Sequence, residues 1–154
     1  MNLLVSWCML GQPCRYDGKS KPAPELKQLE EKGYRLIPVC PEVLGGLPTP
    51  RCPAEIVQGV VTNKEGINVD REFRAGAAKA LAIAKENGVE LAILQPRSPS
   101  CGVKEIYDGT FSGTKIPGQG VFAKMLMDEG IRVLDAGELP KIILKNEDGK
   151  CQSD

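Results

Sequence analysis

Short apolar runs alternate along this chain with longer stretches in which apolar residues recur every three or four positions. The runs have the length and the aliphatic content of strands that are buried on both faces of a sheet. They predict four main strands, at residues 2–6, 34–39, 91–94 and 131–134. A further apolar run at residues 56–61 predicts a short strand at the edge of the sheet.

The periodic stretches predict helices between these strands. A first helix is expected at residues 24–32, with Leu26 and Leu29 on its inner face. A second helix, residues 71–87, carries apolar residues at helical spacing, and Asp70 precedes it as a candidate N-cap. The remaining predicted helices are residues 120–129 and a short last helix at residues 138–144.

The alternation of strands and helices is typical of a parallel sheet with right-handed crossovers. We therefore predict an α/β fold: a three-layer Rossmann-like or flavodoxin-like domain with a mainly parallel sheet. One such domain is expected over residues 1–154, with a polar tail from about residue 145. Residues 40–55 are rich in proline and glycine and are expected to be irregular, while residues 105–111 predict an irregular strand or a hairpin.

The balance of charged residues and the lack of long apolar runs indicate which kinds of binding partner the protein is expected to have. The chain of 154 residues has 20 basic and 20 acidic residues, so its net charge of zero gives no global attraction for nucleic acid. It has neither a signal-like segment nor an apolar run long enough to cross a membrane, which predicts a soluble cytoplasmic protein. The sequence implies no particular oligomeric state. It also lacks the glycine-rich dinucleotide fingerprint and the phosphate-binding P-loop.

Three cysteines stand where three predicted strands end. Cys8 and Cys40 follow the first and second strands, and Cys101 follows the strand at residues 91–94. If these strands are parallel neighbours, the three thiols meet at one edge of the sheet, where open α/β sheets bind ligands. The chain has six cysteines and no histidine. Three sulfurs without imidazole favour an iron–sulfur cluster with one open iron over a saturated zinc site.

Other residues near these thiols are candidates for chemistry, and each also has a purely structural explanation. Glu42 is a candidate general acid or base, or a cap for a backbone turn. Ser98 and Ser100 offer hydroxyl groups beside Cys101, or satisfy the turn around Pro99. Gly118 and Gly120 precede a helix and would let a substrate approach its backbone, or simply form a loop. Four cations are candidates for lowering a thiol pKa: Arg15, Arg51, Arg97 and Lys104.

Four sequence runs, in this order, resemble the thiouracil desulfidase family: VSWCMLGQPCRYDGKS, VCPEVLGGLPTPRCPAE, RSPSCG and GTFSGTKIPGQGVFAKML. The resemblance extends to about Leu139. It implies a Rossmann-like domain with a 4Fe–4S cluster held by Cys8, Cys40 and Cys101. The fourth iron would then be free to take sulfur from a thiolated uracil, with Glu42 and Ser98 as catalytic partners.

The resemblance implies an enzyme that releases hydrogen sulfide from a thiolated pyrimidine without net electron transfer. The zero net charge favours a free base or a nucleoside as substrate. Two further hypotheses stay open. One is a metal or redox sensor whose site is closed by a fourth thiol from Cys14 or Cys52, and the other is a metal-free sulfur carrier with a persulfide on Cys8 or Cys101.

Overall fold

The fold is built around a four-stranded parallel sheet. The computed structural model describes residues 2–20 and 22–138. The sheet has the order β2-β1-β5-β8, and every pair of neighbouring strands in it runs parallel. The predicted parallel α/β fold is therefore confirmed. The strands are β1 (Asn2–Ser6), β2 (Arg35–Val39), β5 (Leu91–Leu94) and β8 (Arg132–Asp135).

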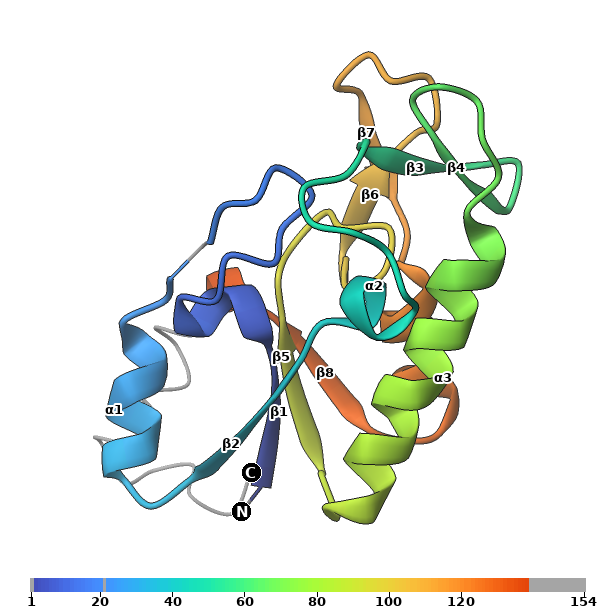
Figure 1. Cartoon of the computed structure of the whole chain (residues 1–154). Helices are drawn as coiled ribbons and strands as arrows, with labels where there is room; N and C mark the ends of the chain where they lie inside the picture. The colour runs from blue at the N-terminus through green and yellow to red at the C-terminus, as the bar shows by residue number, and fades with distance from the viewer. Residues whose placement is uncertain (1, 21, 139–154) are drawn as a thin grey trace.

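Helices cover both faces of this sheet, which gives the three predicted layers (Figure 1). Helix α1 (Glu25–Glu31) packs Leu26 and Leu29 against one face. Helices α3 (Asp70–Glu86) and α4 (Val121–Asp128) bury their apolar sides on the other face. Alternate residues of the central strands face the two layers, so both faces need apolar side chains. That double burial explains why these strands are continuous apolar runs.

The strand order creates a switch point at the carboxyl edge of the sheet. From β1 the chain moves outward to β2, then crosses back over β1 to β5 and continues to β8. The connections that leave β1 and β5 therefore separate, which opens a crevice at that edge. Two antiparallel hairpins stand above it in Figure 1. They are β3 (Ala54–Val57) with β4 (Val60–Asn63), and β6 (Glu105–Tyr107) with β7 (Lys115–Pro117).

The first hairpin corrects the prediction of a single edge strand at residues 56–61. The chain reverses at Gln58 and Gly59, whose φ angles are 49° and 82°. Glycine takes this left-handed conformation easily, and it permits a two-residue turn between paired strands. The second hairpin begins within the predicted range 105–111, but its second strand, β7, lies beyond that range in a stretch expected to be a loop.

A short helix corrects the prediction that residues 40–55 are irregular throughout. Helix α2 (Pro41–Leu44) begins directly after β2, with Pro41 in its first turn. A proline is tolerated there because the first helical N–H groups have no partner within the helix. A further single turn, η1 (Trp7–Leu10), follows β1 in the same way, and η2 (Ala136–Glu138) follows β8.

The predicted capping role of Asp70 is also corrected. Asp70 is the first residue of α3, and the N-cap residue is Val69. The Asp70 carboxylate instead accepts a hydrogen bond from the backbone N–H of Val61 at 2.9 Å and pairs with Arg74. It therefore joins β4 to α3. The predicted helix beyond Glu138 and the polar tail lie outside the described residues.

Helix α2 rests directly on the backbone of α3. A Cβ atom on Gly76 would overlap the carbonyl of Pro41, and one on Gly45 would overlap the carbonyl of Glu72. Glycine at both positions lets the two backbones touch. This contact fixes the segment that carries Cys40 and Glu42. Within the described ranges, no helix is long and apolar enough to cross a membrane.

Candidate functional site

A cavity of about 580 Å³ lies at the carboxyl edge of the sheet. The predicted cysteines Cys8, Cys40 and Cys101 line it, together with Glu42 and Ser98. They reach it from the ends of β1, β2 and β5, which are neighbours in the sheet. The structure thus brings together the three predicted ligands and both predicted catalytic residues.

The three cysteines are buried free thiols, each held by a local feature that follows its strand. Cys8 lies in the single turn η1 after β1. Cys40 is the N-cap residue of α2, and Cys101 lies in the loop after β5. Because the strands are parallel and in register, their ends bring these segments to one edge.

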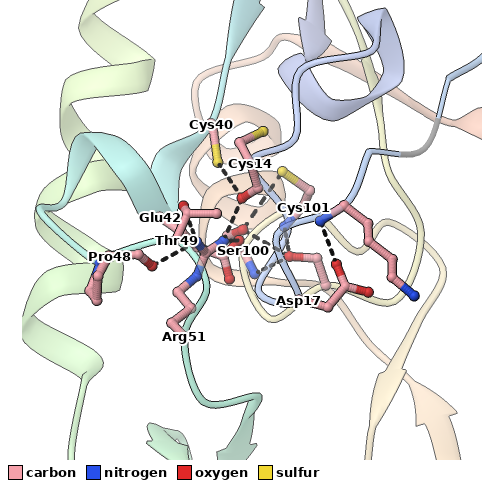
Figure 2. A network of polar contacts seen from close by, with 11 residues as sticks. Cys14, Asp17, Cys40, Glu42, Pro48, Thr49, Arg51, Ser100 and Cys101 are labelled. Carbon is pink, nitrogen blue, oxygen red and sulfur yellow. Dashed lines mark hydrogen bonds and ion pairs between the residues drawn. The ribbon is translucent and has the colours of Figure 1, made fainter.

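A fourth thiol, Cys14, lies among the predicted ligands (Figure 2). The Cys40 thiol donates a long hydrogen bond, 3.9 Å, to the Cys14 carbonyl oxygen. The Cys40 thiol favours the ionised form of Cys14, but the Cys8 thiol and burial outweigh it and raise the pKa of Cys14 to about 11. For Cys40, the neighbouring Cys14 thiol and then burial raise the pKa. A thiol must lose its proton to bind a metal, so a raised pKa opposes metal binding.

Cys101 occupies the third position, surrounded by hydroxyl groups. Burial raises the pKa of its thiol to about 12, although hydrogen bonds from Ser6 and Ser100 favour the thiolate. The Ser100 hydroxyl lies 3.7 Å from the Cys101 sulfur. Ser6 is the last residue of β1, and its hydroxyl also accepts a bond from the backbone N–H of Gln95 at 2.9 Å. It ties the ends of β1 and β5 together beside the cavity.

Glu42 lies in α2 and makes a buried ion pair with Arg51. Its Oε2 atom lies 3.0 Å from Nη2 of Arg51, and the two side chains are 16% and 6% exposed. Burial raises the pKa of Glu42, and the charge and hydrogen bond of Arg51 act against that shift. Glu42 lines the same cavity as Cys40 and Cys101, and after burial and hydrogen bonding its charge adds to the raised pKa of both thiols.

Ser98 shapes the loop that carries Cys101. Its hydroxyl oxygen accepts bonds from the backbone N–H groups of Ser100 and Cys101, at 3.1 and 3.2 Å. It also shares a hydrogen bond of 2.9 Å with the Ser100 hydroxyl. The predicted structural role of Ser98 in a turn is thus present, and the side chain lines the cavity as well.

The other predicted substrate contacts lie behind this loop. Ser100 is fully buried and, like Gly118 and Gly120, is absent from the lining of the cavity. A Cβ on Gly120 would lie 2.5 Å from the backbone carbon of Ser100, so glycine is needed there for close packing. Their role in binding substrate stays a prediction.

Of the four candidate cations, Arg51 is the one whose guanidinium contacts the proposed site residues. Arg15 pairs with Asp17, and Arg97 pairs with Glu105 near the mouth of the cavity. Lys104 pairs with Glu138. Nothing in the sequence distinguished Arg51 from the other three candidate cations. The contacts that Ser6 and Cys14 make in the site could not be predicted from the sequence either. The only sequence hint for Cys14 is that it shares a loop with Cys8.

The donor set fits a multinuclear iron–sulfur cluster better than a single ion. In the described part of the chain, no three Cys, Asp or Glu side chains converge as the ligands of one metal ion would. The ligands of an iron–sulfur cluster lie farther apart than those of a single ion, since each thiolate binds a different iron. Cys8, Cys40 and Cys101 line one cavity from separate strands, which suits ligands of that kind.

The comparisons with known proteins agree with this site. The chain is 41% identical over 151 residues to the uncharacterized protein YbbK of Bacillus subtilis (strain 168), covering 92% of this chain and 99% of that protein. Its structure is similar to that of TudS, described as a [4Fe-4S]-dependent thiouracil desulfidase, with a TM-score of 0.87 and 42% identity. That likeness covers 95% of this chain and 97% of TudS.

A sequence model of the 2-thiouracil desulfurase family matches residues 3–138. The match includes all three strand-end cysteines, Glu42 and Ser98. It confirms the resemblance inferred from the four sequence runs. This chain therefore belongs to the 2-thiouracil desulfurase family.

Proposed function

We propose that this protein is an iron–sulfur-dependent desulfidase that converts thiouracil and water into uracil and hydrogen sulfide. The observation that carries this proposal is the meeting of Cys8, Cys40 and Cys101 in one cavity beside Glu42. The family match and the likeness to TudS support it.

The cofactor of the proposed enzyme is a 4Fe–4S cluster held by the thiolates of Cys8, Cys40 and Cys101. When bound there, the cluster would supply a Lewis-acidic iron that draws electrons from the carbon–sulfur bond of the substrate. The protein supplies three thiolates and leaves one position for the substrate. Burial of the thiols excludes water from the ligands.

Glu42 is proposed to move protons during the reaction. As a carboxylate it accepts a proton from the water that attacks the carbon, and it then returns a proton to a ring nitrogen. Its position at the cavity and its raised pKa suit both tasks, because burial makes the carboxylate a better proton acceptor than an exposed one.

Ser98 is proposed to orient the substrate or the attacking water. Its oxygen already accepts two backbone N–H bonds, so the direction of the hydroxyl is restricted. Ser100, Gly118 and Gly120 are proposed to contribute to substrate binding; of these, Gly120 packs closely against the backbone of Ser100, while Gly118 packs against Ile106.

The proposed reaction is a hydrolysis. Thiouracil and water contain the same atoms as uracil and hydrogen sulfide, and no net electrons are transferred. We place the reaction in the cytoplasm, where cysteines remain reduced. The proposed partner is a small thiolated pyrimidine, either a free base or a nucleoside.

The experiment that tests the function is anaerobic reconstitution of the cluster, followed by assays with 2-thiouracil and 4-thiouracil. We expect the thiocarbonyl absorbance to fall while an equal amount of sulfide appears, and only when the cluster is present. Thiolated nucleosides are assayed in parallel. A full cluster with no turnover on any of these substrates would contradict the proposal.

The position of Cys14 favours one second candidate function, a sensor with a closed four-cysteine site. Cys14 is buried, lines the cavity and accepts a hydrogen bond from the Cys40 thiol through its carbonyl, whereas Cys52 is partly exposed at the cavity wall. Metal analysis separates the two functions. Four irons and four sulfides that survive loss of Cys14 support the desulfidase, and one zinc that needs Cys14 supports the sensor.

A further inference from the structure

Arg51 holds together the segments that form the wall of the cavity. Its guanidinium donates to Oε2 of Glu42 at 3.0 Å and to the carbonyl of Cys14 at 2.9 Å, both from Nη2. Nη1 donates to the carbonyl of Pro48 at 3.2 Å and to the Thr49 hydroxyl at 3.0 Å. Figure 2 shows these contacts converging on one side chain.

The backbone of Arg51 adds another link to the same loop. Its N–H group donates to the carbonyl of Tyr16 at 2.6 Å. One residue therefore connects the proline-rich segment to the Cys14–Tyr16 loop twice and to α2 once. The guanidinium can make these bonds together because its donors are planar and fixed in direction, which a lysine ammonium cannot reproduce.

Glu42 needs such a partner because its backbone alone does not fix its carboxylate. The contact of α2 with α3 fixes the backbone of this segment, but the long Glu42 side chain keeps rotatable bonds that the backbone does not restrain. The ion pair restrains the carboxylate through Oε2 and leaves Oε1 outside that pair. A carboxylate that transfers protons must hold one oxygen in a fixed place relative to the substrate.

The charge of Arg51 also suits this place. The cavity is lined by Glu42 and by the thiols of Cys8, Cys40 and Cys101. These thiols become negatively charged when they bind metal. Arginine keeps its positive charge under all ordinary conditions, even when it is buried. Its side chain is 6% exposed, so its attraction for the carboxylate is poorly screened by water.

We infer that Arg51 is a positioning residue that orients the Glu42 carboxylate for proton transfer and fixes the Cys14–Tyr16 loop beside it. This inference rests on the proposed function for its catalytic consequence. Its structural consequence, the place of the Glu42 carboxylate, needs no turnover to be observed.

The test compares Arg51→Lys and Arg51→Gln with the wild type. Arg51→Lys keeps the charge but loses the planar set of donors, and Arg51→Gln loses both. Arg74→Gln is the matched control, because Arg74 also pairs with a carboxylate, that of Asp70, but at an exposed position on α3. Each protein is measured for iron and sulfide content, for kcat and KM, and for the position of Glu42 in a crystal structure.

We expect both Arg51 variants to assemble the cluster and to bind substrate with KM changed less than about threefold. Since small misplacements of a catalytic group can cost about 100-fold, kcat should fall about 10-fold in Arg51→Lys and about 100-fold in Arg51→Gln. Arg74→Gln should match the wild type. The crystal structures should show the Glu42 carboxylate displaced in both Arg51 variants.

The inference is overturned if kcat stays within twofold of wild type in both variants, or if the activity lost equals the cluster lost. It is also overturned if Glu42 keeps its place in the variant crystals. A wild type that assembles its cluster without turnover would defeat the proposed function instead. The position of Glu42 in the crystals would then still decide whether Arg51 orients it.

Discussion

The thiol of Cys40 donates a long hydrogen bond, 3.9 Å, to the carbonyl oxygen of Cys14. Cys40 is a proposed cluster ligand, while Cys14 is not required by the family resemblance. The two residues come from different segments, since Cys14 follows η1 and Cys40 follows β2. Their contact makes Cys14 the residue on which the choice between an open and a closed site depends.

We predict that Cys14→Ser retains the cluster and its activity. The three proposed ligands lie on other segments, so the variant should contain four irons and four sulfides and keep kcat within about threefold, as expected when no ligand is lost. Cys8→Ser, Cys40→Ser and Cys101→Ser should each lose most of the cluster. Iron and sulfide analysis with the visible absorbance spectrum checks this. A Cys14→Ser protein without a cluster would favour the closed four-cysteine site.

Replacement of Glu42 should separate chemistry from cluster binding. Glu42→Gln keeps the shape of the side chain but removes its ability to accept a proton, so kcat should fall by at least about 100-fold. The cluster content should be unchanged, because Glu42 is not a proposed ligand. Sulfide release measures the activity. Glu105→Gln, at an exposed carboxylate that pairs with Arg97, is the control and should be fully active. An active Glu42→Gln enzyme would remove Glu42 from the mechanism.

The contact of α2 with α3 predicts a strong effect of Gly76→Ala. The added Cβ would overlap the Pro41 carbonyl, so α2 must move away from α3. Overpacking of this kind costs about 1–3 kcal/mol in the free energy of unfolding, and the displaced helix carries Glu42. Urea denaturation and sulfide release measure the two effects.

In Gly76→Ala, the overlap with Pro41 and the higher helix propensity of alanine act in opposite directions on stability. A second variant measures the effect of helix propensity alone. Ala78→Gly lies on the exposed side of α3 and should cost about 1 kcal/mol without loss of activity. By propensity alone, Gly76→Ala would gain a similar amount. A Gly76→Ala protein that is more stable than wild type and fully active would mean that the two helices separate easily.

The link between Asp70 and Val61 predicts a pH-dependent contribution to stability. Burial opposes ionisation of Asp70, but the bonds from Val61 and Arg74 outweigh it and lower the pKa of the carboxyl group. The ionised form is thus favoured in the folded protein. Its contribution is present above the ordinary pKa of an aspartate and is lost as the pH falls through the lowered folded pKa.

Asp70→Asn should therefore destabilise the protein by about 1 kcal/mol at neutral pH, the usual size of one hydrogen-bond contribution. The difference from wild type should shrink when urea unfolding is repeated at about pH 3, close to the range in which aspartates titrate. Asp128→Asn, at an exposed residue of α4, should show no difference at either pH. An unchanged gap at low pH would mean that the charge of Asp70 does not stabilise the fold.

The sheet and the meeting of the three cysteines could be predicted from the sequence because both depend on regular features. A strand buried on both faces must be apolar along its length, and β1 and β5 are recognisable on that basis. The edge strand β2 is recognisable from its short aliphatic run, although it keeps exposed residues. Parallel strands then bring their carboxyl ends together. Cys8, Cys40 and Cys101 follow those ends closely, so little freedom is left in their placement.

The contacts made by irregular segments could not be predicted in the same way. The Glu42–Arg51 pair requires the proline-rich loop to turn back onto α2, and its path has no periodic pattern. Helix α2 is too short to produce a periodic pattern of apolar residues. A proline at its start, Pro41, is equally consistent with a loop. Cys14 reaches Cys40 because Arg51 binds its carbonyl, which is a tertiary contact.

The order of strands in the sheet has a consequence for how a bound cluster would affect the fold. Cys8 and Cys101 are distant in the sequence and share a cavity only because β1 pairs with β5, while β1 must also pair with β2 to bring Cys40 there. No short segment of the chain contains all three thiols. A cluster bound by them would therefore tie together three strands of the sheet, so that loss of the cluster and loss of the pairing around β1 would be linked.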